Sequence, residues 1–180
     1  IDDDAQFRCV EMPSHSEVST FMASVTEQQL DTHLASLKSH FLGMYFERLW
    51  HFFLTYNERF QLLASNLQIH EHGKTIGEFD FVVYDKLKQQ HYHQELAIKF
   101  YLGYLDPTSQ ESSWIGPQSV DRLNLKMNKL IHHQLKLPKQ PAAQSRLQEL
   151  GVETITSRLL IKGALFKPNN HTSVGVPPYI

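Results

Sequence analysis

Two neighbouring segments of the chain, residues 75–84 and 91–101, carry charged side chains where a buried strand would carry apolar ones. The first contains Asp80, and the second carries Glu95 and Lys99 on one face, because side chains alternate along a strand. If the segments pair as adjacent strands, their backbones lie about 4.8 Å apart, and Asp80 and Glu95 reach one cation. Packing alone gains nothing from such charges, so they predict a metal-dependent hydrolytic site.

These motifs resemble the PD-(D/E)XK nuclease-like superfamily, and within it the DUF1853 family of bacterial proteins. Gly77–Asp80 (GEFD) matches the superfamily's GExD element, and Glu95–Lys99 (ELAIK) is similar to its ExK element. The resemblance implies an α/β fold with a restriction-endonuclease-like αβββαβ core, a central mixed sheet flanked by helices. It also implies a nuclease in which Asp80, Glu95 and Lys99 are catalytic. Asp80 and Glu95 would bind Mg²⁺ or Mn²⁺, and Lys99 would position water or stabilise charge on the phosphate.

The second element departs from the superfamily pattern, because Ala97 holds the position that is usually acidic. At about 3.4 Å per residue, Glu95 and Lys99 lie about 14 Å apart along a straight strand. A bulge or another acid is therefore needed to rebuild a compact site. Superfamily members often turn an acid of the first helix into the site, and the resemblance offers Glu47 as that further metal ligand. Glu78, on the same strand face as the GExD aspartate, is the weaker alternative.

The substituted acid leaves two classes of function open. One is a metal-dependent nuclease that acts on DNA or RNA. The other is a nuclease-like fold that no longer cleaves and serves as a binding or scaffold module, a reading that Ala97 and the mild net acidity favour. Measuring the approach of the Asp80 and Glu95 carboxylates separates the two, because shared coordination requires both oxygens about 2.1 Å from one ion.

Polar residues also gather where the third predicted helix begins, beside a long loop. A helix N-terminus attracts anions, so we expect Gln118, Arg122 and Lys126 to bind substrate phosphates. Asp121 at the same place is equally well explained by a favourable interaction with the helix dipole. A solvated basic face is the ordinary explanation for Lys126 and the lysines that follow it.

The remaining composition is that of a single globular domain. Of 180 residues, 41% are hydrophobic and 20% charged. No apolar run approaches the roughly 20 residues of a membrane span, so we expect no membrane partner. Cys9 stands alone, which excludes an intrachain disulfide and is typical of the cytoplasm. His91 and His93 have a zinc-compatible spacing but no evident third ligand. A net charge of −2 leaves only a local basic face for nucleic acid.

Hydrophobic periodicity predicts the elements that hold these residues. We expect an irregular arm over residues 1–25, one nuclease-like domain over 26–168 and an irregular tail over 169–180. Within the domain the sequence predicts helices over 26–39, 41–56, 119–137 and 144–150, strands over 61–70, 75–84, 91–101 and 157–166, and a long loop over 103–118. The helix over 41–56 should be a main core element, because Trp50 and Phe53 lie on its apolar stripe.

Overall fold

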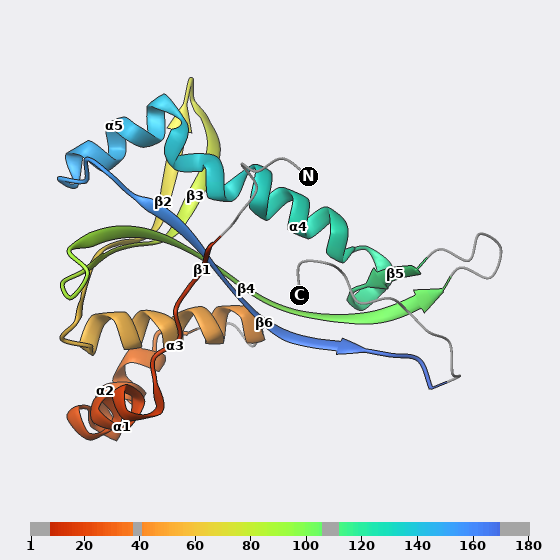
Figure 1. Ribbon diagram of the computed structural model, residues 1–180, viewed down its shortest axis with the longest axis horizontal. Helices are drawn as coiled ribbons and strands as arrows, with labels where there is room; N and C mark the ends of the chain where they lie inside the picture. The colour runs from red at the N-terminus through yellow and green to blue at the C-terminus, as the bar shows by residue number, and fades with distance from the viewer. Residues whose placement is uncertain (1–7, 38–40, 106–111, 170–180) are drawn as a thin grey trace.

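A mixed six-stranded sheet forms the centre of the computed structural model, which describes residues 8–37, 41–105 and 112–169 (Figure 1). The strands are β1 (Arg8–Cys9), β2 (Phe60–Glu71), β3 (Lys74–Asp85), β4 (Gln90–Leu105), β5 (Ser112–Ile115) and β6 (Thr156–Phe166). They lie in the order β1-β6-β4-β3-β2, with β5 paired to the end of β4. The β2, β3 and β4 strands form an antiparallel meander, whereas β6 runs parallel to β4 and β1. The predicted mixed sheet flanked by helices is thus confirmed, as is the antiparallel pairing of the two motif strands.

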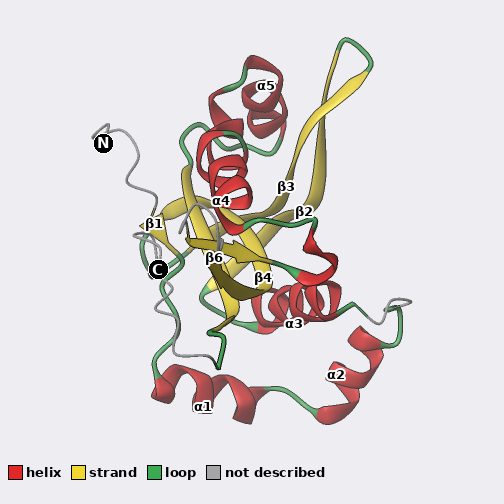
Figure 2. Ribbon diagram, turned by 90° about the vertical axis from the view of Figure 1, so that its right-hand side faces the viewer, coloured by secondary structure: helices red, strands yellow, loops and turns green. Residues whose placement is uncertain are grey.

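Helices cover both faces of this sheet (Figure 2). They are α1 (His15–Ser24), α2 (Glu27–Leu34), α3 (Leu42–Tyr56), α4 (Leu123–His132) and α5 (Pro141–Glu149), with short 3-10 helices η2 (Pro117–Ser119) and η3 (Gln134–Lys139). The α3 helix packs on one face, and α4, η3 and α5 pack on the other. No helix in the described ranges is long and apolar enough to cross a membrane.

The α3 helix is a main core element, as predicted. Trp50 and Leu54 are buried against Phe81, Val83 and Leu160 of the sheet. Phe53, expected to be buried as well, is half-buried at the edge of this cluster. The helix therefore holds its polar residues in a fixed position relative to β3 and β4.

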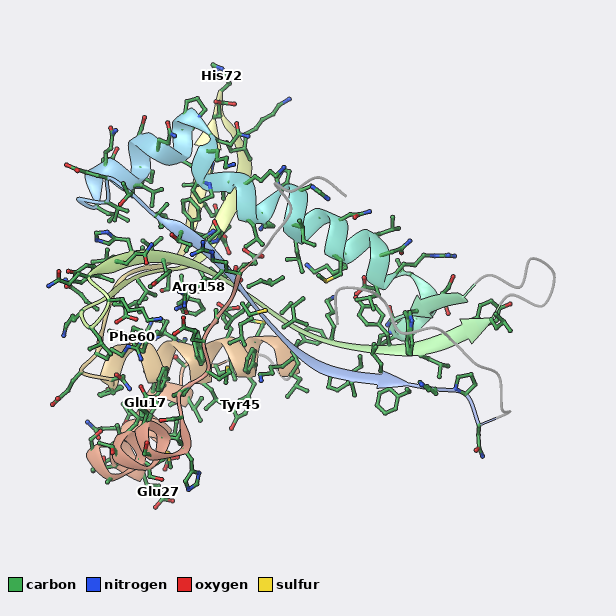
Figure 3. The ribbon with its side chains drawn as sticks, in the orientation of Figure 1. Glu17, Glu27, Tyr45, Phe60, His72 and Arg158 are labelled. Atoms are coloured by element: carbon green, nitrogen blue, oxygen red, sulfur yellow. The ribbon has the colours of Figure 1, made fainter. Side chains whose placement is uncertain are left out.

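The β2–β3 hairpin closes through a tight two-residue turn. His72 and Gly73 both have positive φ angles, 48° and 75°, which is the backbone geometry of turns that match the twist of a hairpin. Figure 3 shows His72 at the outer tip of the hairpin, whereas Arg158 lies near the middle of the sheet. The histidine-rich turn is thus remote from the centre of the sheet.

The N-terminal arm, expected to be irregular over residues 1–25, contains α1. Ser14 and Glu17 form a capping box at its start, in which each residue's side chain accepts a hydrogen bond from the other's backbone N–H (3.3 and 2.8 Å). Phe21 is buried with its ring 5.0 Å from that of Phe53. The helix is therefore stabilised by one buried aromatic residue, which gives too short an apolar pattern to predict it from periodicity.

The helix expected over residues 119–137 is divided into α4 and η3 at His133. It begins later than expected because Arg122 is extended (φ −125°, ψ 131°) and forms an isolated bridge with Ile115. Pro138 lies inside η3 rather than after the helix, in keeping with its inability to continue an α-helical hydrogen-bond pattern.

The other predicted boundaries differ less. The helix expected over 26–39 corresponds to α2, which ends at Leu34. The long loop expected over 103–118 contains the end of β4, β5 and η2, and its residues 106–111 lie outside the described residues. The same holds for the expected tail beyond residue 169.

Candidate functional site

The first two motif residues lie where β3 and β4 separate. The ladder between these strands runs from Asp85, paired with Gln90, to Phe81, paired with Gln94. Asp80 is the next residue on β3, and the carboxylate oxygen Oδ2 of Asp80 accepts a hydrogen bond from the Leu96 backbone N–H (2.7 Å). The Asp80 side chain thus takes the place of a backbone carbonyl just beyond the last strand pair. Glu95 follows Gln94 on β4, and its charge acts on Asp80.

Asp80 sits among other acids in a partly buried position. Burial raises the pKa of Asp80 to about 7, and the charge of Glu95 adds to this effect. Glu47 of α3 and Glu78 of β3 contribute further in the same direction, against the opposing Leu96 hydrogen bond. Acidic side chains of α3, β3 and β4 therefore all disfavour the charged form of Asp80, and the helix acid Glu47 that the sequence proposed is among them.

Asp85, at the other end of the β3–β4 ladder, is a carboxylate whose pKa shifts in the opposite direction. Burial opposes its ionisation, yet its pKa is lowered because Arg59 donates two hydrogen bonds to it, from Nε (3.0 Å) and Nη2 (2.7 Å). The backbone N–H groups of Leu87 and Lys88 donate to it as well. Asp85 is a satisfied structural residue, whereas Asp80 accepts one hydrogen bond from the described residues and has several acids that act on its charge.

Glu95 is buried, with 5% of its surface exposed. Its Oε1 atom accepts a long hydrogen bond from Gln134 Nε2 (3.4 Å). Its Oε2 atom has no hydrogen-bond partner among the residues described and lies 3.5 Å from His93 Nε2. A buried carboxylate oxygen without a donor is costly, which marks this oxygen as a candidate ligand for a cation.

Lys99 is paired with Asp121, a residue to which sequence reasoning assigned another role. Its Nζ donates to Asp121 Oδ2 (2.7 Å), which also accepts from the Tyr101 hydroxyl (3.2 Å). Burial disfavours the charged form of Asp121, but these donors outweigh it and lower its pKa. Asp121 precedes α4, where the sequence offered an interaction with the helix dipole, and no local sequence signal indicated its contact with Lys99.

Of the three residues expected to bind substrate, Lys126 lies near the acids. Burial lowers its pKa, as does the charge of Lys99, whereas Glu95 and Asp121 act in the opposite sense. Gln118 and Arg122 are exposed on η2 and at the start of α4. Lys126, an expected substrate-binding residue, therefore lies near Glu95 and Lys99, together with Asp121, which was not expected there.

A pocket of about 550 Å³ opens beside Lys99, between α4 and the β4–β6 pair. Its polar lining comprises Lys99, Lys126, Lys162 and Tyr101. Leucine, isoleucine and methionine side chains form most of the rest. Three ammonium groups around an apolar cavity suit a ligand that combines a flat or apolar body with negative charge.

Within the described ranges, no three His, Cys, Asp or Glu side chains lie close enough together to hold one ion. Mg²⁺ is commonly bound through one or two carboxylates, with water and substrate phosphate completing its coordination. Asp80 and Glu95, which interact electrostatically, are the candidate carboxylates for a site of that kind. The two histidines of zinc-compatible spacing lie in different environments, His91 against the ring of Tyr84 and His93 against that of Phe79.

Comparison with known proteins gives one result. The family model described as a domain of unknown function (DUF1853) matches residues 7–179. No curated protein and no solved structure matches the chain. The match covers nearly all of the 180 residues, so the chain belongs to the DUF1853 family.

Proposed function

We propose that the protein is a metal-dependent nuclease, with the restriction-endonuclease-like core of the PD-(D/E)XK superfamily. The observation that carries the proposal is the convergence of Asp80 and Glu95 where β3 and β4 separate, in surroundings that raise the pKa of Asp80 to about 7. Acids in this arrangement are unfavourable without a cation and become favourable with one. The element order α3, β2, β3, β4, α4, β6 supports the same core.

Each residue has a role in this proposal. Asp80 and Glu95 would hold Mg²⁺ or Mn²⁺, and Glu47 would support the ligand set from α3. A bound divalent ion would polarise the phosphoryl oxygen and make its water more acidic. Lys99 would stabilise negative charge that develops on the phosphate, with Asp121 fixing the direction of its ammonium group.

The pocket beside Lys99 supports nucleic acid as the substrate. Lys99 and Lys126 at its polar side would contact backbone phosphate, and its apolar wall suits an unstacked base. The net charge of the chain does not attract nucleic acid, so these lysines would supply the local attraction.

A second function, a non-cleaving binding module with the same fold, is favoured by two observations. Ala97, at the position where the superfamily pattern has an acid, is buried in an apolar cluster with Leu159 and Met127. Lys99 is already neutralised by Asp121. Both features are what a binding domain that has lost catalysis would retain.

Cleavage of labelled single- and double-stranded DNA and RNA tests the proposal. We expect wild-type protein with Mg²⁺ or Mn²⁺ to cleave at least one substrate, and Lys99→Ala to reduce the rate by about 100-fold, because a preorganised charge is lost in the transition state. Lys139→Ala, which removes an exposed lysine on η3, serves as the matched control and should leave the rate unchanged. Absence of cleavage by the wild type, together with binding of the same nucleic acids, would establish the binding module instead.

A further inference from the structure

His93 lies in the interior beside the proposed cation site. It is fully buried on β4, opposite Val82 of β3. Its ring packs at 70° against that of Phe79, with 4.7 Å between the ring centres. A polar ring at such a position needs partners for both of its nitrogens.

Hydrogen bonds fix which ring nitrogen carries the proton. The Ser157 hydroxyl donates its single hydrogen to the Leu135 carbonyl oxygen (2.8 Å). Ser157 Oγ must therefore accept from His93 Nδ1, which lies 3.2 Å away. In the neutral ring the hydrogen is therefore on Nδ1, and Nε2 keeps a lone pair that can accept a hydrogen bond or bind a metal ion.

That lone pair faces a second acceptor. His93 Nε2 and Glu95 Oε2 are 3.5 Å apart, and both are buried without a hydrogen-bond partner in the part of the chain that the structure describes. A proton shared between such atoms would bring them to about 2.7–2.9 Å. Two ligands of one metal ion, each about 2.1 Å from it and 3.5 Å from each other, subtend about 113° at the ion, close to a tetrahedral angle.

We propose that His93 is a nitrogen ligand that binds a divalent transition-metal ion together with Glu95. The inference rests on the proposed function in taking Glu95 as a metal ligand, and it deepens that function by assigning the kind of metal. An imidazole nitrogen favours ions such as Co²⁺ and Zn²⁺ over Mg²⁺, which prefers oxygen ligands. The Ser157–Leu135 hydrogen bonds would hold the ring in the ligating orientation, as outer partners of metal-bound histidines do.

The test compares Co²⁺, Zn²⁺ and Mg²⁺ binding to the full chain by calorimetry, with the visible absorption of Co²⁺ recorded in parallel. We expect His93→Gln to weaken Co²⁺ and Zn²⁺ binding at least about tenfold and to change the Co²⁺ spectrum, while Mg²⁺ affinity stays within about twofold. His91→Gln, two residues away on the same strand, is the matched control and should change neither. Equal weakening of all three ions, or no change in the Co²⁺ spectrum, would overturn the assignment.

A measurement on the unaltered protein covers the case in which His93→Gln does not fold. Pulsed electron paramagnetic resonance of the Mn²⁺-loaded wild type should reveal coupling of the metal to an imidazole nitrogen. Bound Mn²⁺ without nitrogen coupling would refute the role of His93. Cleavage is measured separately, so the two proposals can fail independently. Nitrogen coupling without cleavage would support the His93 metal site and refute the nuclease activity. Cleavage without nitrogen coupling would support the nuclease activity and refute the His93 metal site.

Discussion

Asp80→Asn is expected to raise the unfolding midpoint of the metal-free protein at pH 8. The folded protein disfavours the charged Asp80, because burial and the nearby Glu95 raise its pKa from 3.8 to about 7. A shift of that size corresponds to a penalty on the order of 4 kcal/mol once the carboxylate is ionised. Asparagine removes the charge and keeps an oxygen that accepts the Leu96 N–H. For a chain of this length, the gain is a rise of about 8–16 °C.

The pH dependence follows from the direction of the shift. Because the folded state binds the Asp80 proton more tightly than the unfolded chain does, the contribution of Asp80 to wild-type stability falls as the pH rises from about 4 to about 7. Below pH 4 the carboxyl is protonated in both states, so the advantage of Asp80→Asn should disappear there. Thermal unfolding of both proteins between pH 4 and pH 8 measures this difference.

Asp85→Asn is the matched control on the same strand. Asp85 is ionised and paired with Arg59, so its replacement should lower the midpoint at pH 8 by breaking a buried charge pair. Saturating Mg²⁺ or Mn²⁺ should stabilise the wild type and Asp85→Asn but not Asp80→Asn. Equal destabilisation by the two substitutions would mean that Asp80 is an ordinary structural carboxylate.

Gly163→Ala is expected to destabilise the protein by more than about 3 kcal/mol, because the position is closed to any side chain. Gly163 of β6 pairs with Lys99 of β4, and a Cβ atom built on it would lie 1.6 Å from the Lys99 carbonyl oxygen. Its φ of +147° is also a conformation that other residues rarely adopt. The β4–β6 pair would have to separate at Lys99, so the proposed nuclease activity should fall together with stability.

Gly151→Ala separates backbone strain from this steric conflict. Gly151 has a φ of +74°, but no atom lies within 4 Å of the added Cβ. We expect this control to cost about 1–2 kcal/mol, the strain of a left-handed residue alone. Denaturant unfolding of both variants gives the comparison. A loss for Gly163→Ala no larger than that for Gly151→Ala would contradict the close approach of β6 to Lys99.

The strands and α3 could be predicted from sequence because each has a local signal. Alternation defines the two motif strands, and the apolar stripe through Trp50 defines α3. The α1 helix was missed because one buried residue, Phe21, holds it in place. Its signal was the capping box of Ser14 and Glu17, which periodicity does not register.

The candidate site could be predicted only in part, because its geometry depends on where strands part and which distant residues meet. Strand alternation brings Asp80 near Glu95, but it cannot predict that the ladder ends after Phe81, leaving Asp80 to accept the Leu96 N–H. Lys99 of β4 contacts Asp121, although β5 and η2 lie between the two residues in the sequence. That contact depends on tertiary packing, and no local pattern encodes it.

Calorimetric titration of Mn²⁺ into the wild type and Asp80→Asn at pH 8 tests the central claim most directly. Asp80 is mostly ionised at that pH and available as a ligand, since its pKa is about 7. The account predicts saturable binding to the wild type, an affinity at least about tenfold weaker for Asp80→Asn, and wild-type binding by the control Glu153→Gln, which alters an exposed acid. Absence of Mn²⁺ binding to the wild type, or equal affinity in Asp80→Asn, would contradict a cation site at Asp80 and Glu95.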